Sequence, residues 1–367
     1  MPLFMDFHKM ENVTIEDVKT AHKADLAIQK KYGVRYHQFW VNKEAGVVFC
    51  LVEGPNKESC EAVHREAHDN IAFAVTEVEG GIYKTLMGES MWADHGLVNS
   101  ENGDIDLGYR NILVASVYSS TKATHSKDLS LFQTPHWARQ LILEKIAVFN
   151  GREIKWETDD SLIGVFNDST KAVTCALNIQ HQLNQSQQNQ SAIIFRMGIS
   201  AAQPVTENGD FFIDAIRLAH RICNVAKDNQ VLVSSLTKKL YKEKDLMAGL
   251  SSFKSLDIAE EKFVTSLLNI AELKLSDCSF SVDDLSNEIC ISRPQLYRKI
   301  TAISGRSPHD LIHDLRMDKA LTLLKRKTGN IAEIAFETGF NSASYFTKCF
   351  TDKFGCTPSA FEKQLPA

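Results

Sequence analysis

Two segments near the C-terminal end of the chain repeat one local pattern, in which a short helix, a tight turn and a second helix follow one another. The first segment begins at Ser281 and the second at Asn330. Ser281 and Asp284 have the spacing of a helix capping box, and Ser292 and Gln295 repeat that spacing shortly afterwards. Two helix starts this close together leave room only for a short helix and a turn, so the pattern predicts a helix-turn-helix unit.

The second segment has the same signals in the same order. Asn330 with Glu333 predicts one helix start, Gly339 a tight turn, and Asn341 or Ser342 the next helix start. Three phenylalanines then follow at the spacing of one helix face, which favours a place in the core over a ligand role: Phe346, Phe350 and Phe354. In the first segment, the outward positions of the second helix fall on Arg293, Gln295, Tyr297 and Arg298.

The stretch between the two units predicts a rigid spacer. Ser307 and Pro308 have the signature of a helix start, and apolar residues continue at helical spacing to about Lys327. Roughly twenty residues at about 1.5 Å each give about 30 Å. Successive major grooves on one side of B-DNA lie about 34 Å apart, so one chain is expected to reach two consecutive grooves of double-stranded DNA. A helical domain that binds another protein is the alternative.

Two blocks, Gly339-Phe-Asn-Ser-Ala-Ser-Tyr-Phe346 and Phe354-Gly-Cys-Thr-Pro358, carry a further signal. With them, residues 260–361 resemble the AraC/XylS family of transcription regulators, which implies an all-α double helix-turn-helix domain over residues 260–367. The resemblance implies base-reading positions at Arg293, Pro294, Tyr297 and Arg298, and at Ala343, Ser344, Tyr345, Thr347 and Lys348. Together with the outward Gln295 and the helix-start residues Asn341 and Ser342, these are the predicted DNA-binding residues. One departure is Cys290, which stands where the first turn of the family usually carries glycine.

The charge of the chain is divided in a way that fits this interpretation. The 367 residues include 41 Lys and Arg against 46 Asp and Glu, a net charge of −5. Residues 289–367 hold 12 basic and 7 acidic residues, a balance of +5, whereas residues 1–80 hold 9 and 13, a balance of −4. The basic end is the one predicted to meet phosphate.

Composition bounds the rest of the molecule. With 44% hydrophobic and 24% charged residues, the chain is long enough for two or three domains with full cores. Its eight cysteines lack paired spacing, which favours reduced thiols. The first residues lack a basic region followed by an apolar run, and no stretch approaches about eighteen apolar residues, so we expect a cytoplasmic location.

The first eighty residues alternate between strand and helix patterns. Strand-like alternation covers residues 3–8, 36–41, 46–52 and 71–78, and helical periodicity covers residues 14–32 and 56–69. This order predicts a ferredoxin-like sandwich over residues 1–80.

Histidines gather in this predicted domain, which holds five of the twelve in the chain. His64 and His68 are spaced i, i+4 on one helix face, so both imidazoles can face one point. His22 lies on the other predicted helix, His8 closes the first strand, and Cys50 lies in the third. Alone, each histidine is more often a surface or packing residue, and Cys50 is more often a core residue. Together the five predict a transition-metal site.

Four stretches of this domain, Met5-Asp-Phe-His8, Ala21-His-Lys-Ala-Asp-Leu26, Val48-Phe-Cys-Leu-Val-Glu53 and Val63-His-Arg-Glu-Ala-His68, resemble a small ferredoxin-like family of nickel-binding proteins. The resemblance covers residues 1–80. Imidazole and thiolate donors favour nickel, zinc, copper or iron over magnesium or calcium, and nickel or zinc is the first expectation. Another small-molecule effector is the alternative.

The middle of the chain predicts a second α/β domain between two linkers. Residues 81–108 are rich in Gly, Asn and Asp and are predicted to be a linker, and a second linker is predicted at residues 242–259. Between them, residues 109–241 contain strand patterns at 111–118, 153–157, 162–166, 195–201 and 230–234, and helix patterns at 136–149, 170–183 and 212–225.

Three blocks of the middle domain, residues 150–166, 196–199 and 215–222, resemble the class III nucleotidyl cyclase homology domain. Such cyclases hold two metal ions on two carboxylates, because two cations must stabilise the attacking and leaving oxygens together. Asp159 matches one carboxylate, but Ser116 stands in place of the other and Arg217 in place of an asparagine. Lys155 and Arg221 match a base-contacting lysine and a phosphate-stabilising arginine. The resemblance therefore implies an inactive domain in which Lys155, Asp159 and Arg221 are a nucleotide-binding remnant.

These parts together predict a multidomain α+β chain that acts as a one-component transcription regulator. A metal-binding N-terminal module and a cyclase-like middle would control the double helix-turn-helix, in a homodimer and without enzymatic activity. One alternative is a divergent nucleotidyl cyclase fused to a DNA-binding domain, which Ser116 argues against. Another is a metal buffer with a vestigial DNA-binding domain, which the intact helix caps argue against.

Overall fold

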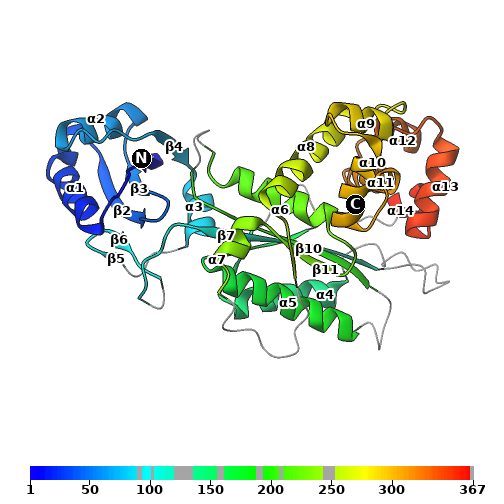
Figure 1. The fold of residues 1–367 in the computed structure, drawn as a ribbon, viewed down its shortest axis with the longest axis horizontal. Helices are drawn as coiled ribbons and strands as arrows, with labels where there is room; N and C mark the ends of the chain where they lie inside the picture. Colours follow the sequence, from blue (N-terminus) through cyan, green and yellow to red (C-terminus); the bar gives the residue numbers. More distant parts are fainter. Residues whose placement is uncertain are drawn as a thin grey trace.

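The computed structural model describes residues 1–88, 93–100, 103–119, 135–154, 161–186, 193–205, 210–242 and 253–363 of the chain. Three regions follow one another along the longest axis, an N-terminal α/β region, a middle α/β region and a helical C-terminal region (Figure 1). In these described ranges, no helix combines the length and the apolar character needed to cross a membrane. The predicted multidomain α+β architecture is confirmed.

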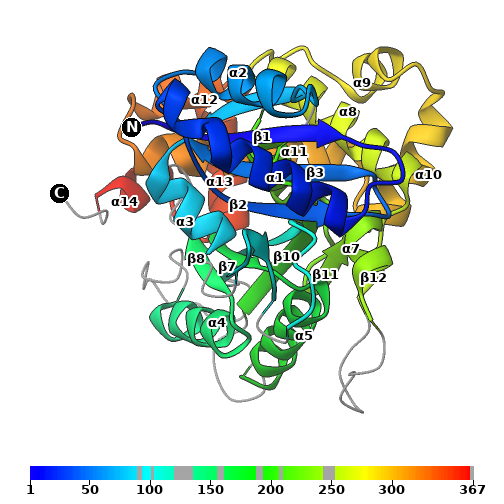
Figure 2. The same cartoon turned by 90° about the vertical axis from the view of Figure 1, so that its left-hand side faces the viewer.

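The N-terminal region is a sheet with two helices on one face. The sheet has the order β4-β1-β3-β2-β6-β5, and β1 pairs antiparallel with both β3 and β4. Helix α1 lies over one face of the sheet, beside α2 (Figure 2). The elements of the sandwich are β1 Leu3–Lys9, α1 Ile15–Ile28, β2 Arg35–Asn42, β3 Val47–Glu53, α2 Lys57–Ala67 and β4 Ala74–Val78. The order and type of these elements confirm the predicted ferredoxin-like sandwich.

The segment predicted as the first linker differs from that prediction. It contains α3 Gly80–Met87, β5 Ala93–Asp94 and β6 Leu97–Val98, and β6 extends the N-terminal sheet by pairing with β2. Leu86, Met87, Leu97 and Val98 are all buried. The glycines and asparagines of this segment therefore mark tight turns between short packed elements, which are too short to show a periodicity in sequence.

Within the described residues, the middle region is a sheet of six strands in the order β12-β11-β10-β7-β9-β8. Helices α4 and α5 cover one face of this sheet, and α6 lies on the other (Figure 1). The strands are β7 Arg110–Ser119, β8 Arg152–Ile154, β9 Leu162–Phe166, β10 Ile193–Ala202, β11 Gln230–Val233 and β12 Lys254–Ser255. The helices are α4 His136–Val148, α5 Ser169–Ser186, α6 Ile213–Val225 and α7 Ser235–Leu240. Of the second predicted linker, residues 243–252 lie outside the described residues.

The N-terminal and middle regions share one hydrophobic core. Met5 and Phe7 of β1 and Phe49 of β3 belong to the same buried cluster as Ile112 and Val114 of β7. Residues of α6 join this cluster as well. The face of the N-terminal sheet that α1 and α2 leave uncovered is therefore buried against the middle region, as in two packed layers of one domain.

Two arginines of the middle region hold the C-terminal end of α3. Arg110 is fully buried, with its Nη2 2.9 Å from Asp106 Oδ2, and it donates from Nε to the Leu86 carbonyl at 3.2 Å and from Nη2 to the Met87 carbonyl at 3.1 Å. Arg152 donates to the carbonyl of Thr85 at 2.8 Å. The last carbonyls of a helix have no partner within it, so these guanidinium groups satisfy them and tie α3 to β7 and β8.

From residue 258 to residue 363, the C-terminal region consists of seven helices: α8 Ile258–Lys274, α9 Val282–Glu288, α10 Arg293–Ser304, α11 Pro308–Lys325, α12 Ile331–Glu337, α13 Ala343–Phe354 and α14 Pro358–Glu362. The predicted capping boxes at Ser281, Ser292 and Asn330 are all present. Ser307 caps the spacer helix α11, which has 18 residues and a length of about 27 Å. Residues of α8 and α10 share a buried cluster with Ile222 of α6, so this region also packs on the middle region.

Candidate metal centre and nucleic-acid interface

Strand β1 brings two polar side chains to the face covered by the helices. Because side chains alternate along a strand, Asp6 and His8 lie on the face opposite Met5 and Phe7. Asp6 and His8 are both buried, and His8 Nε2 lies 3.4 Å from Asp6 Oδ1. Opposite Asp6 on the neighbouring strand, the backbone N–H of Cys50 donates to Asp6 Oδ1 at 2.8 Å. The strands thus supply one carboxylate and one imidazole to the layer between sheet and helices.

His64 of α2 connects these strand residues to α1. Its Nε2 lies 2.8 Å from Asp6 Oδ2, and its Nδ1 lies 3.3 Å from Asp25 Oδ1. His68, one turn later, places Nε2 3.1 Å from the same Asp25 oxygen and 3.3 Å from His64 Nδ1. Two donor sets result, one of Asp6, His8 and His64 and one of Asp25, His64 and His68, and the donor atoms within each set lie within 4.8 Å of one another.

The donor sets have the dimensions of a transition-metal site. Bonds of about 2.0–2.2 Å place the ligands of such an ion roughly 3–4 Å from one another. Both sets meet that spacing with small movements, and both supply imidazole nitrogen and carboxylate oxygen. The residues present therefore fit a nickel or zinc ion.

The electrostatics of the cluster show what a cation would replace. Burial acts to raise the pKa of Asp6, but the charge of His8 and hydrogen bonds from His64 outweigh it and hold the Asp6 pKa well below its usual range. Burial acts to lower the pKa of His64, but hydrogen bonds to Asp25 and Asp6 raise that pKa to about 10. Without metal, a protonated His64 therefore supplies the positive charge between two buried carboxylates.

The five predicted metal ligands divide into two groups. His8, His64 and His68 lie together in the donor sets. His22 and Cys50 are buried at the margin of the cluster and belong to neither set. The ring centroid of His22 lies 5.0 Å from that of Phe39, and, among the described residues, its buried Nδ1 has no hydrogen-bond partner.

Sequence reasoning missed the two carboxylates of the centre. Asp6 stands two residues before His8 on a strand, so both must share a face, and this spacing was a usable signal. Asp25 stands three residues after His22 on α1 and points at α2. Carboxylates are so common on surfaces that only the packing of α1 against α2 identifies this one as buried.

The raised pKa of His64 gives a prediction for metal-free protein. A histidine whose folded-state pKa is about 10, against an ordinary 6.5, contributes stability that is fully present below about pH 6.5 and is lost as the pH rises toward 10. We therefore expect the urea midpoint of the metal-free protein to fall between pH 7 and pH 10. The fall should be clearly smaller in His64→Gln, and an equal fall in both proteins would contradict the charged state assigned to His64.

The two helix-turn-helix units place the predicted reading residues at the surface. In α10, Arg293, Pro294, Gln295 and Arg298 are exposed and Tyr297 is half-buried. In and before α13, Asn341, Ser344, Tyr345 and Lys348 are exposed, whereas Ser342, Ala343 and Thr347 are half-buried. The inward faces carry the predicted core, with Phe346 and Phe350 fully buried. The structure thus leaves one face of each second helix available to a groove.

Cys290 occupies the turn of the first unit in a backbone conformation that favours glycine. Its φ is +58°, and Gly339 holds the equivalent turn of the second unit with φ +79°. The departure from glycine in the first unit therefore leaves the turn geometry unchanged. The left-handed conformation of this L-residue costs about 1–2 kcal/mol of folding free energy.

These two turns predict opposite effects of substitution on stability. Cys290→Gly relieves the left-handed strain, so we expect a gain of about 0.5–1 kcal/mol after the extra freedom of glycine in the unfolded chain is subtracted. Gly339→Ala adds that strain and places a Cβ 2.1 Å from the Leu275 carbonyl oxygen, so we expect a clear loss. Urea denaturation measures both. A stability loss in Cys290→Gly would show that the thiol has a structural role.

Of the predicted nucleotide-binding remnant, only Arg221 lies in the described part of the chain. Lys155 and Asp159 lie outside the described residues. Arg221 of α6 is bonded to Asn269 and lies 3.7 Å from Glu272, both on α8. Its guanidinium therefore joins the middle region to the C-terminal region. Ser116 lies on β7 opposite Arg196 of β10.

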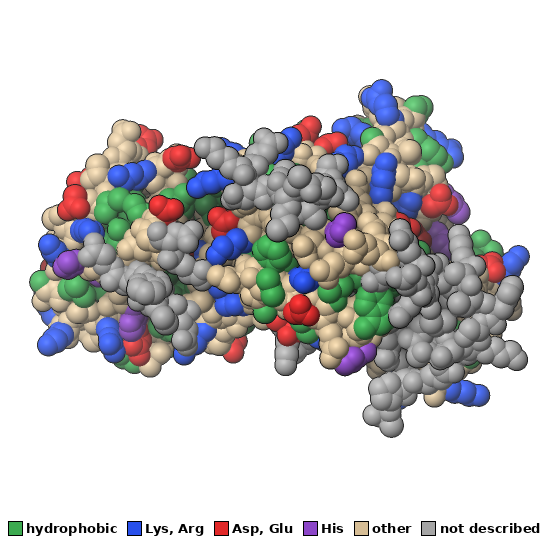
Figure 3. All heavy atoms as spheres, turned by 90° about the horizontal axis from the view of Figure 1, so that it is seen from below, with side chains coloured by type: hydrophobic (Ala, Val, Ile, Leu, Met, Phe, Trp, Pro, Cys, Tyr) green, Lys and Arg blue, Asp and Glu red, His purple; other side chains and the backbone are tan. Residues whose placement is uncertain are grey.

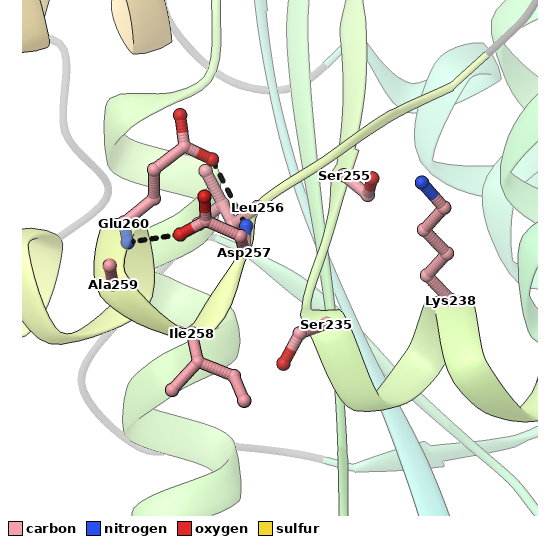
Figure 4. A pocket seen from close by; sticks show the side chains of 8 residues that line it. All are labelled: Ser235, Lys238, Ser255, Leu256, Asp257, Ile258, Ala259 and Glu260. Carbon is pink, nitrogen blue, oxygen red and sulfur yellow. Dashed lines mark hydrogen bonds between the residues drawn. The ribbon is translucent and has the colours of Figure 1, made fainter.

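A shallow hollow lies where β12 leads into α8, and Figure 4 shows the side chains that line it. The first backbone N–H groups of a helix are a common anion site. Here, however, Asp257 accepts from the Glu260 N–H at 2.7 Å, and the Glu260 carboxylate accepts from the Asp257 N–H at 3.0 Å. The protein's own carboxylates therefore take the place that a phosphate would occupy.

Comparison with known proteins supports the assignments at both ends. Residues 285–364 match the family described as a helix-turn-helix domain, and residues 4–78 match the family described as nickel responsive protein SCO4226-like. The uncharacterized HTH-type transcriptional regulator YidL of Escherichia coli is 29% identical over 163 residues, which are 44% of this chain and 53% of YidL. The chain spans about half the length of YidL and less than a third of other curated relatives that it matches.

Two solved structures are similar to separate parts of the chain. The crystal structure of SCO4226 from Streptomyces coelicolor A3(2) is 38% identical and covers 21% of this chain and 94% of that chain, with a TM-score of 0.20. The crystal structure of an adenylate/guanylate cyclase/hydrolase from Silicibacter pomeroyi is 26% identical and covers 37% and 81%, with a TM-score of 0.31. The resemblances predicted for the two ends are confirmed by the family matches, and the chain therefore joins a SCO4226-like N-terminal domain, through an α/β middle domain, to an AraC-type helix-turn-helix domain.

Proposed function

We propose that this protein is a transcription regulator that binds double-stranded DNA through α10 and α13 under the control of a transition-metal ion. The observation that carries the proposal is the pair of capped helix-turn-helix units on one spacer helix, in the basic segment of an otherwise acidic chain. The length of α11, about 27 Å for its 18 residues, suits two helices that enter consecutive major grooves. Figure 3 shows acidic and basic side chains interspersed over the described part of the face seen from below.

The reading residues proposed for DNA are those predicted from sequence. Arg293 lies 3.1 Å from Asp283 and its guanidinium is 5.8 Å from the Tyr297 ring centroid. Exposed ion pairs of this kind contribute little to stability, so DNA can take the place of Asp283 at small cost. Arg298 is exposed beside it. If either arginine meets a guanine edge, alanine there should weaken site-specific binding roughly 5-fold to 150-fold and relax specificity at one position.

The metal would be held by Asp6, His8, His64, Asp25 and His68. Nickel and zinc both accept this mixture of imidazole and carboxylate, and the family match of residues 4–78 supports nickel. Bound metal would supply the positive charge that protonated His64 otherwise provides. Uptake of the ion therefore competes with a proton and should weaken as the pH falls.

The fold supplies a route from the metal to the middle domain. Asp6 and His8 alternate along β1 with Met5 and Phe7, which pack in the core shared with the middle region. A shift of β1 by the bound ion therefore moves side chains of that core directly. Control further requires that the ion bind the DNA-competent and the incompetent arrangement with different affinity.

We propose that the middle domain couples the two ends and is not an enzyme. Arg221, the described member of the predicted nucleotide remnant, joins α6 to α8. The homodimer predicted through this domain remains a proposal, and sedimentation at micromolar concentration tests it. Formation of cyclic AMP or cyclic GMP that Asp159→Ala abolishes would favour the cyclase alternative.

The central test combines metal content with DNA binding. Protein purified without chelators is analysed for bound elements, and its binding to duplexes selected from a random-sequence pool is measured before and after metal removal. We expect roughly one or two ions per chain, in line with the two donor sets, and a changed DNA affinity after removal. The matched control is His37→Ala, because His37 is in the same domain and pairs with Glu53 outside the centre. Unchanged DNA binding with and without bound metal would exclude metal control, and failure to select any duplex would exclude the DNA-binding role.

A further inference from the structure

A row of largely buried charges crosses the C-terminal region, beginning at Arg306. Arg306 lies between α10 and α11, and its Nη2 donates to the carbonyls of Asn224 at 2.6 Å and Ala226 at 3.4 Å, at the end of α6. Its Nη1 lies 3.0 Å from Asp314 Oδ2 on the spacer helix. One guanidinium therefore connects the middle region, the loop after α10 and the spacer helix α11.

The other carboxylate oxygen of Asp314 extends this row of charges to α13, the second helix of the second helix-turn-helix unit. Lys353, in the last turn of α13, places Nζ 3.0 Å from Asp314 Oδ1 and 3.0 Å from Asp318 Oδ1. The side chains of Arg306, Asp314 and Lys353 are 15%, 21% and 19% exposed, so water competes little for these bonds. Asp314 thus bridges two cations, one from the loop after the first helix-turn-helix unit and one from the second unit.

We infer that Arg306, Asp314 and Lys353 are positioning residues, which fix the rotation of α13 relative to α10 and to the middle domain and thereby set the half-site spacing that the protein accepts. The inference rests on the proposed DNA-binding function. The spacer helix fixes a distance along its axis. Directional bonds from Asp314 to both sides also fix an angle about that axis. The DNA double helix makes one turn in about 10–10.5 base pairs. If the angle between α10 and α13 is fixed, both helices can therefore enter their grooves at only a few half-site spacings.

A purely long-range electrostatic role for Asp314 makes the opposite prediction for one substitution. Asp314→Asn removes a negative charge without a change of shape. If the charge acted only through the general field of the protein, its removal would tighten DNA binding. If Asp314 positions α13, the loss of its charge weakens binding to a correctly spaced site. The sign of the effect therefore separates the two roles.

The test uses the full chain and duplexes that wild-type protein selects from a random-sequence pool, each compared with a version that has one base pair inserted between the two protected half-sites. We expect the insertion to weaken wild-type binding about tenfold or more. In Asp314→Asn and Arg306→Gln we expect about tenfold weaker binding to the original duplex, a much smaller further loss on insertion, and a footprint reduced over one half-site only. Arg306→Lys keeps the charge but not the forked arrangement of donors. Its DNA affinity and its insertion penalty should therefore lie between those of the wild type and Arg306→Gln.

The control variant is Lys274→Gln, which breaks an exposed ion pair to Glu288 within the same region and should keep the wild-type spacing preference. Circular dichroism melting shows whether each variant is folded at the assay temperature, and Asp314→Asn, which preserves the side-chain shape, carries the result if Arg306→Gln unfolds. The inference is overturned if Asp314→Asn binds the original duplex as tightly as wild type or keeps the full insertion penalty. It falls together with the proposed function only if the wild-type protein selects no duplex.

Discussion

Replacing His64 by alanine is expected to weaken the binding of Ni²⁺ or Zn²⁺ at least about a hundredfold. His64 is the residue that the two donor sets share, with Nε2 facing Asp6 and Nδ1 facing Asp25 and His68. Its removal therefore takes a ligand from both sets at once. Isothermal titration calorimetry of the metal-free protein measures the loss.

Two other histidines provide the comparison for this variant. His8→Ala and His68→Ala each remove a ligand from one set only, so each should cost less affinity than His64→Ala and should leave binding to the other set. His64→Gln keeps a polar group between the carboxylates and guards against a loss that is due to unfolding. If His64→Ala bound metal like the wild type, or if the distant His37→Ala lost as much, the proposed centre would be in the wrong place.

The metal centre shows how far local spacing reaches. The i, i+4 spacing of His64 and His68 is fixed by the helix itself, so sequence was enough to place those two imidazoles together. Asp25 enters the centre only through the packing of α1 on α2, which no local pattern encodes. His22 and Cys50, also predicted as ligands, are buried, but their atoms lie outside both donor sets because ring orientation and side-chain direction depend on tertiary packing.

The C-terminal domain was predicted well because its signals are local. Ser281, Ser292 and Asn330 each bond to backbone groups two or three residues away, so the helix starts are written in adjacent residues. The linker prediction for residues 81–108 fails for the converse reason. Leu97 pairs with Phe39, far away in sequence, and a two-residue strand has no periodicity to detect. Its existence depends on the sheet edge that it joins.

Replacing Arg110 by alanine is expected to destabilise the protein by roughly 3–5 kcal/mol, because it leaves a buried carboxylate without its partner. Arg110 is fully buried and bonds Asp106 through both Nη atoms, at 3.1 Å and 2.9 Å. The substitution also frees the carbonyls at the end of α3 that Arg110 satisfies. Urea denaturation followed by circular dichroism measures the loss. The control is Arg139→Ala, which breaks an exposed pair to Glu153 in the same region and should cost below about 1 kcal/mol.

The shape of the Arg110→Ala transition tests whether the two α/β regions unfold as one body. Their shared core contains residues of β1, β3, β7 and α6, so loss of the α3 anchor should destabilise both regions together and leave a single transition. Two separated transitions, with the metal-binding region lost first, would show that Arg110 rather than the shared core holds the regions together. In that case the packing of Met5 and Phe7 of β1 in the shared core could not transmit the effect of a bound ion. Helix α3 would instead connect the metal centre to the rest of the protein.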